Sequence, residues 1–211
     1  MKHLTIATAV LAIATPLAAE NRIDGQAANA PALAAYGEYS VGVRQFEFTN
    51  PDQINILAID PSAPRPDNFD LYDRPLTVEV WYPSVDGAVG DTSLDAYLRD
   101  GVTQVSLEGQ AVRDAQAADV AEPLPVVLLS HGYPGNRFLM SHLAENLASK
   151  GYVVASIDHT DSTYNDQSAF GSTLVNRPLD QSFVLDELER LNTDASSGLS
   201  GMMNTDQAGL I

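Results

Sequence analysis

Two short apolar runs limit what this sequence can fold into. Residues 124–129 (LPVVLL) and 152–157 (YVVASI) are apolar almost throughout and do not alternate with polar residues. Such runs are typical of strands in a parallel sheet that is covered on both faces. Between them, residues 137–150 carry leucines at helical spacing, and Gly151 follows as a helix stop. The pattern predicts an α/β fold with a mainly parallel sheet.

A second crossover follows the second run. Pro178 suits the first position of a helix, and the apolar face of that helix would use Val184, Leu188 and Leu191. Four acids are expected to face water: Asp180, Asp186, Glu187 and Glu189. Residues 208–211 resemble a third buried strand.

The segment before these units predicts antiparallel strands that open the sheet. Residues 41–48, 55–59 and 76–82 have strand patterns, and the last of them alternates apolar and polar positions. Residues 83–123 are polar and weakly periodic. They are expected to form a surface connection with one or two short helices, one near residues 94–99.

The N-terminus has the pattern of a secretory signal. Lys2 precedes an apolar run that ends in small residues, so residues 1–19 are interpreted as a signal peptide cleaved after Ala19. The run is shorter than the roughly 20 residues that a membrane span needs, so no stable membrane insertion is expected. Residues 20–40 are expected to form a flexible lead-in, and residues 41–211 the N-terminal portion of a single domain. The expected location is secreted or periplasmic.

Charge and composition exclude several functions. The formal net charge is -17, which disfavours binding to nucleic acid. The chain has no cysteine, so it has neither disulfides nor a thiol nucleophile. The sequence predicts no metal site.

Residues 130–135 (SHGYPG) join a buried strand to a helix and carry the chemistry. A turn at this place presents backbone N–H groups at the carboxyl edge of the sheet, beside a helix N-terminus that favours negative charge. That is half of an oxyanion hole for acyl transfer. The hexapeptide alone is equally compatible with a tight connecting turn.

In several segments the chain resembles the α/β-hydrolases, in the branch that holds platelet-activating factor acetylhydrolase and predicted dienelactone hydrolases. The similar segments are residues 75–83, 124–135, 151–159, 177–180 with 183–186, and 206–211. The resemblance implies an α/β-hydrolase fold with antiparallel N-terminal strands, truncated after the fifth strand.

The resemblance also implies roles for individual residues. The backbone N–H of Tyr133 falls on the first oxyanion donor, with Gly132 shaping the turn. His131 and Gly135 would support the loop, His131 through a hydrogen bond. A substrate rim would contain His159, Asp161, Tyr164 and Phe170, although the loop is equally compatible with a mobile surface segment.

The catalytic serine of such enzymes follows the fifth strand in a Gly-x-Ser-x-Gly turn. It is therefore expected beyond Ile211, with the acid and histidine later still, so these 211 residues alone are expected to be inactive. Ser200 does not replace it, because Met202 stands where the second glycine belongs. His159 with Asp161 is compatible with a partial triad or a metal pair, but two side chains fall short of the three or four ligands that a metal site usually needs. The pair is interpreted as a turn that orders the neighbouring loop. His142 is interpreted as a helix-surface residue.

The function implied is a secreted serine-type carboxylic ester hydrolase that works through an acyl-enzyme without a cofactor. Its substrate would be a small-molecule ester or a lipid. Two alternatives stay open. One is a non-catalytic remnant or binding protein, and the other is a peptidase or polyester hydrolase on the same fold.

Overall fold

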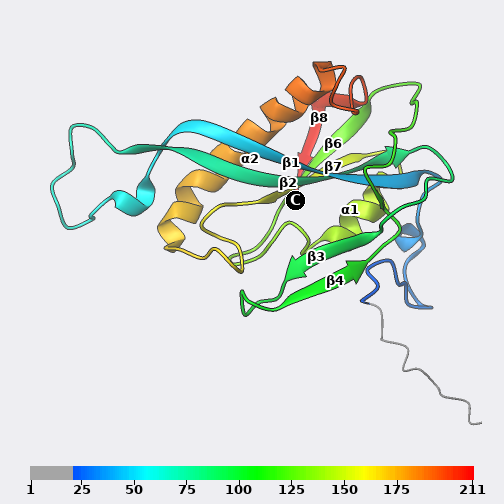
Figure 1. Cartoon of the computed structure of the whole chain (residues 1–211), viewed down its shortest axis with the longest axis horizontal. Coiled ribbons are helices and arrows are strands. Elements are labelled where there is room, and N and C mark those ends of the chain that lie inside the picture. Colours follow the sequence, from blue (N-terminus) through cyan, green and yellow to red (C-terminus); the bar gives the residue numbers. More distant parts are fainter. Residues whose placement is uncertain (1–20) are drawn as a thin grey trace, which may run out of the picture.

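The computed structural model describes residues 21–211, and the expected signal peptide lies outside this range. A six-stranded sheet has the order β5-β1-β2-β7-β6-β8 (Figure 1). Its strands are β1 (Ser40–Ile54), β2 (Leu71–Ser84), β5 (Val112–Arg113), β6 (Leu124–Ser130), β7 (Val153–Asp158) and β8 (Met203–Leu210). Only β2 runs against the other strands of this sheet. The prediction of a mainly parallel sheet with antiparallel pairing near the N-terminus is confirmed.

Two helices connect the parallel strands. Helix α1 (Ser141–Ala148) joins β6 to β7, and α2 (Phe170–Thr193) joins β7 to β8 on the other side of β6. The helices cover opposite faces of the sheet (Figure 1). Because the connections leave β6 and β7 toward opposite faces, a crevice is expected at the carboxyl ends of these two strands.

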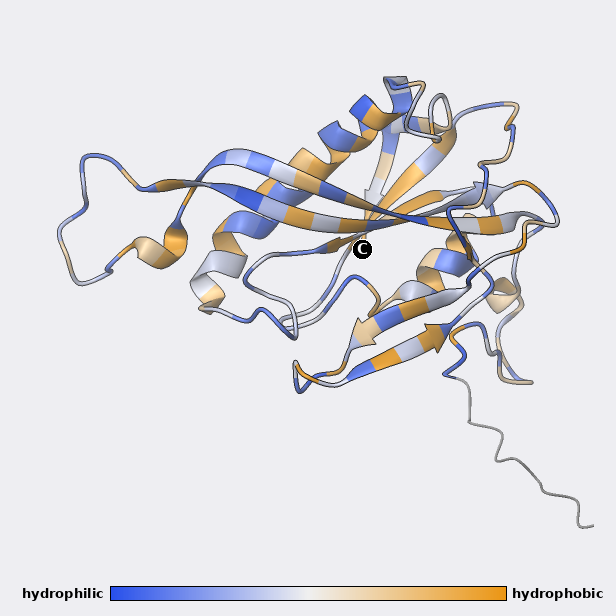
Figure 2. Cartoon of the chain, in the orientation of Figure 1, coloured by the Kyte–Doolittle hydropathy of each residue, from blue (hydrophilic) through white to orange (hydrophobic). Residues whose placement is uncertain are grey.

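The sheet has a core on each face. Under α2, the even-numbered residues of β6 pack with Val184 and Leu188, whereas Val127 and Leu129 face α1. Strand β6 is apolar along most of its length in Figure 2. Burial on both faces is the reason for its continuous apolar sequence.

Strands β1 and β2 form a long antiparallel pair that extends beyond the rest of the sheet (Figure 1). The strand predicted at residues 55–59 is wrong, because Ile56–Ala58 forms a 3-10 helix in the connection between β1 and β2. No sheet partner supports that segment, whereas the pairing of β1 with β2 carries both strands further than their alternating patterns suggest.

The helix predicted near residues 94–99 is also wrong. Strands β3 (Ser93–Tyr97) and β4 (Gln104–Glu108) form an antiparallel hairpin there. Leu94 and Ala96 are buried, with the exposed Asp95 between them. This alternation over five residues is a strand pattern, and it lets the hairpin cover the α1 side of the sheet.

Both helices differ from their expected bounds. Helix α1 begins four residues later than expected, and Phe138 rather than Leu139 is buried in the turns before it. Helix α2 begins at Phe170, so Pro178 lies inside the helix and not at its start. The first two turns contain glycine and β-branched residues with low helix propensity, which hid them from the sequence pattern.

Asp180 was expected to face water, but its side chain is fully buried. It lies four residues before Val184 and eight before Leu188, so it shares their buried face. A pair with Arg74 compensates for the burial of its charge. Asp186 and Glu189 are exposed as predicted.

The exposure of β8 and the hydrogen bonds of the segment before β1 both differ from what the sequence predicted. Strand β8 begins at Met203, earlier than predicted, and its last residues are exposed because β8 lies at an edge of the sheet. Before β1, where a flexible lead-in was expected, the Ile23 N–H donates to Glu108 O and the Tyr39 N–H donates to Ser149 O. A short 3-10 helix (Ala32–Ala34) lies in this segment.

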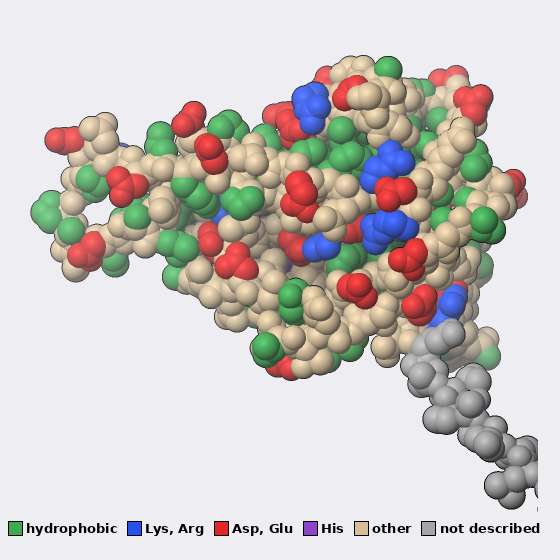
Figure 3. Space-filling view, viewed as in Figure 1, with side chains coloured by type: hydrophobic (Ala, Val, Ile, Leu, Met, Phe, Trp, Pro, Cys, Tyr) green, Lys and Arg blue, Asp and Glu red, His purple; other side chains and the backbone are tan. Residues whose placement is uncertain are grey.

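Acidic side chains are scattered over the molecular face shown in Figure 3, whereas Lys and Arg gather near its middle. This distribution agrees with the net charge of -17. None of the helices within residues 21–211 is both long and apolar enough to cross a membrane.

The α2 core can be tested with two leucines of the same helix. Leu188 is 0% exposed and Leu179 is 48% exposed. We expect Leu188→Ala to lower the free energy of unfolding by ~2–5 kcal/mol, because it removes buried methyl groups and leaves a cavity. Leu179→Ala should change it by less than ~0.5 kcal/mol. Equilibrium denaturation of both variants measures the difference, and equal losses would contradict the packing described.

Candidate active site

Residues 130–135, here called the oxyanion turn, leave β6 at the edge of the sheet and lead toward α1. The Gly135 N–H donates to Ser162 O at 3.2 Å, and the Tyr164 N–H donates to Gly135 O at 2.8 Å. A Cβ on Gly135 would lie 2.7 Å from His131 Nδ1, so this position has no room for a side chain. A Cβ on Gly132 would meet open space. The turn is therefore packed on one side and open on the other.

Tyr133 lies on the open side. Its backbone N–H has no hydrogen-bond partner within residues 21–211. Its ring packs edge-on against Phe170 with the centroids 4.9 Å apart, and its hydroxyl donates to Ser168 O. An unpaired N–H beside open space can donate to a ligand oxygen.

His131 is buried beneath the turn, where only 1% of its surface is exposed. Nδ1 lies 2.7 Å from Gly132 O, which can only accept, so Nδ1 carries the proton. Nε2 accepts from the His159 N–H at 3.3 Å. Burial lowers the pKa of His131 to about 3, so the ring is neutral at pH 7. These two hydrogen bonds are the ones that a loop-supporting histidine would make.

A line of three side chains lies under the start of the turn. Ser130 Oγ is 2.9 Å from His159 Nε2, and His159 Nδ1 is 2.9 Å from Asp180 Oδ2. This order of atoms matches that of a Ser-His-Asp triad. Burial lowers the pKa of His159, against the effect of Asp180. A neutral ring that donates from Nδ1 to Asp180 accepts from the Ser130 hydroxyl.

The surroundings of this line favour a supporting role. His159 and Asp180 are fully buried, and Arg74 binds both oxygens of Asp180, with Nε–Oδ1 at 2.7 Å and Nη2–Oδ2 at 2.9 Å. Burial alone would raise the pKa of Asp180, but hydrogen bonds from His159 and Arg74 bring it below its usual value. Ser130 also ends a regular strand rather than occupying a sharp strand-to-helix turn.

The four expected rim residues separate into two pairs. His159 and Asp161 do not line the surface, because both are buried under the turn. Asp161 has φ 71°, and its Oδ2 accepts from Arg74 Nη1 at 3.0 Å and from Ser172 Oγ at 2.8 Å. Tyr164 is half-buried and Phe170 is 52% exposed, so these two remain at the surface.

Sequence reasoning placed Ser130 in the turn without a role of its own, and it missed Arg74, Arg177 and Asp180 as members of this site. Asp180 could have been found, because its spacing from Val184 and Leu188 places it on the buried face of α2. Arg177 lies one turn earlier and reaches the oxyanion turn. Arg74 carries no local signal, since its partners Asp161 and Asp180 are remote in the sequence.

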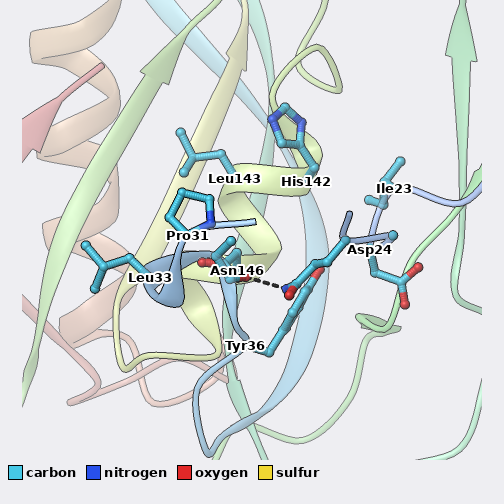
Figure 4. Close-up of a pocket in the computed structure, with 11 residues that line it drawn as sticks. Ile23, Asp24, Pro31, Leu33, Tyr36, His142, Leu143 and Asn146 are labelled. Atoms are coloured by element: carbon cyan, nitrogen blue, oxygen red, sulfur yellow. Dashed lines mark hydrogen bonds between the residues drawn. The ribbon is translucent and has the colours of Figure 1, made fainter. Parts of the chain in front are cut away.

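Other residues that were considered lie apart from the turn. Ser200 is an exposed loop residue, and its hydroxyl donates to Asn192 O at 3.2 Å. The His142 side chain borders a mostly apolar hollow of about 480 Å³ between the N-terminal segment and α1 (Figure 4). Leu33 and Leu143 line the same hollow, which contains no residue of the oxyanion turn. Within residues 21–211, no three His, Asp or Glu side chains form a group that could hold a metal ion.

Burial of His131 predicts a pH dependence of stability. Its pKa falls from about 6.5 in the unfolded chain to about 3 in the fold. Below pH 6.5 the unfolded state therefore binds the additional proton, and stability falls by up to ~1.4 kcal/mol per pH unit until the folded pKa is reached.

We expect His131→Gln to lower stability at pH 7 and to flatten this slope between pH 6.5 and 4. The exposed His142 provides the matched control, since His142→Gln should keep the slope of the parent protein. Urea unfolding across this pH range measures all three proteins. Parallel slopes for the His131 variant and the parent would contradict a buried neutral ring.

Comparison with known proteins identifies a similar fold and the family of the chain. The chain is similar to a ferulic acid esterase from Streptomyces cinnamoneus, with a TM-score of 0.60, 24% identity, and coverage of 91% of this chain and 54% of the esterase. It thus spans about half the length of that structure, and at this identity the likeness shows the fold. A search of curated proteins gave no match. The family model for platelet-activating factor acetylhydrolase, isoform II, matches residues 74–191, more than half of the chain. The chain therefore belongs to the platelet-activating factor acetylhydrolase, isoform II, family.

Proposed function

We propose that this chain is the oxyanion-turn portion of a secreted serine-type hydrolase that cleaves carboxylic esters of small molecules or lipids. The observation that carries the proposal is the unpaired Tyr133 N–H on the open side of a turn at the carboxyl edge of the sheet. Family membership and the fold likeness to an esterase support the reaction class. The N-terminal pattern at residues 1–19 supports secretion.

The proposed nucleophile is a serine that follows β8. Ile211 comes directly after β8, and its carbonyl accepts at 2.8 Å from the N–H of Ser130, the first residue of the oxyanion turn. A serine reached from that point would lie beside the Tyr133 N–H. Attack on the ester would develop negative charge on the carbonyl oxygen, and the Tyr133 N–H would stabilise it. A histidine would take the serine proton and pass it to the alcohol as the ester C–O bond breaks. Water would then hydrolyse the acyl-enzyme, which releases the acid and restores the serine.

The first test is activity and labelling of the protein expressed from its complete coding sequence. We expect hydrolysis of short-chain nitrophenyl esters and a fluorophosphonate adduct on a serine in a Gly-x-Ser-x-Gly segment. Ser200→Ala should leave the labelling unchanged. Cleavage of peptide amides without esters would favour a peptidase. Absence of both activity and labelling would favour a non-catalytic remnant, and an adduct on Ser130 would replace the proposed nucleophile.

The second test removes the proposed oxyanion donor. Tyr133→Pro deletes the backbone N–H, and we expect kcat for ester hydrolysis to fall by roughly 10²–10³-fold. Tyr133→Phe keeps the N–H and loses the hydroxyl, which donates to Ser168 O and accepts from Gln167 Nε2, so it should retain most of the activity. Steady-state kinetics, with melting temperatures to confirm folding, measure both. Similar kcat values for two folded variants would refute the donor.

A further inference from the structure

The peptide group between Gly132 and Tyr133 has two ends with opposite surroundings. Its carbonyl, Gly132 O, accepts from His131 Nδ1 at 2.7 Å and from Arg177 Nη2 at 3.0 Å. Its N–H has no partner within residues 21–211. A trans peptide is planar, and its C=O and N–H point in opposite directions. Because Arg177 on α2 binds the carbonyl, the Tyr133 N–H points away from α2.

Arg177 holds this carbonyl with an unusual set of partners. Its Nη1 also donates to His131 O, and its Nη2 donates to Ser162 Oγ at 2.6 Å. No carboxylate lies within ion-pair distance of Arg177 in residues 21–211, and its Nε is buried without a partner. Burial lowers the pKa of this half-buried guanidinium, although Asp180 opposes the effect. Its positive charge is thus directed at carbonyl oxygens of the oxyanion turn.

We propose that Arg177 is a positioning residue that orients and polarises the Gly132–Tyr133 peptide so that the Tyr133 N–H is fixed as the oxyanion donor. This inference rests on the proposed esterase function and adds a residue to it. A hydrogen bond from a charged donor is roughly twice as strong as a neutral one. It draws electron density toward Gly132 O, which leaves the N–H of the same peptide a stronger donor.

The glycine at position 132 explains why the Gly132–Tyr133 peptide needs hydrogen bonds to fix its orientation. A Cβ at this position would meet open space, so no side-chain contact restrains rotation of the peptide. Glycine also tolerates backbone conformations that other residues avoid. Without the two bonds to Gly132 O, the peptide could rotate and remove the N–H from the substrate side. His131 supplies one bond as a neutral donor, and Arg177 supplies the other with a charge.

The kinetic test compares arginines of the same helix in the complete protein. We expect Arg177→Met to lower kcat for nitrophenyl ester hydrolysis by roughly ten- to a hundredfold, less than the loss of roughly 10²–10³-fold expected when the oxyanion donor itself is removed. KM should change little, because the donor acts on charge that develops in the transition state. Affinity for a short-chain alkyl trifluoromethyl ketone, which forms a tetrahedral adduct with the serine, should fall in parallel. Arg190→Met is the control, since Arg190 is exposed and paired with Glu187.

A structural role alone would give a different result. Arg177→Met with a lower melting temperature but unchanged kcat and unchanged ketone affinity would overturn the inference. Arg177→Lys retains the charge without the forked donors, so it should recover part of kcat if polarisation contributes. If Arg177→Lys recovers no kcat and yet binds the ketone as tightly as the parent protein, that result would also count against the positioning role.

A spectroscopic arm does not depend on activity. With ¹⁵N-tyrosine labelling, the Tyr133 amide signal is assigned by its loss in Tyr133→Phe. A hydrogen bond to the preceding carbonyl deshields this nitrogen, so Arg177→Met should move the signal upfield while Arg190→Met leaves it in place. If the parent protein hydrolyses no ester, the proposed function fails, yet the signal still decides the role of Arg177. An unmoved signal refutes that role even in an active enzyme.

Discussion

The site depends on one buried carboxylate. Asp180 is fully enclosed between Arg74 on β2 and His159 at the end of β7. Losing one member of such a pair is strongly destabilising, by ~3–5 kcal/mol, because it leaves an uncompensated charge in the interior. Apolar contacts also keep α2 against the sheet. The paired carboxylate fixes the position of the helix along the strands.

The fixed position of α2 also sets the position of Arg177, one helical turn before Asp180. Residues 177 and 180 share a face of α2, so anchoring Asp180 also places Arg177 under the oxyanion turn. The same carboxylate orients His159, whose ring binds Ser130 and whose N–H binds His131. The turn is thus held by side chains from α2 and the end of β7, although it lies between β6 and α1.

The sequence predicted the parts of this fold whose signals are local. Residues 124–129 and 152–157 read as strands because burial on both faces makes a sequence uniformly apolar. Their order along the chain, together with the SHGYPG motif, was enough to locate the turn.

The features that the sequence did not predict depend on contacts between residues that are far apart in the chain. The hairpin at Leu94 alternates over too few residues to outweigh a polar neighbourhood. Asp180 was assigned to the surface because acids usually lie there, and its burial is compensated by Arg74, 106 positions away, and by His159, 21 positions away. Arg177 looked like part of a helix start, and its role depends on carbonyls 45 and 46 positions away.

The partners of four arginines around the sheet also affect the electric field of the molecule. Four arginines bind partners around the sheet: Arg74, Arg113, Arg137 and Arg177. Among these partners are the fully buried Glu79 and Asp180. Few cations are left to offset the surface acids in a chain of net charge -17. For the proposed reaction this favours release, because the acid formed from an ester carries the same sign as the protein and is repelled into solvent.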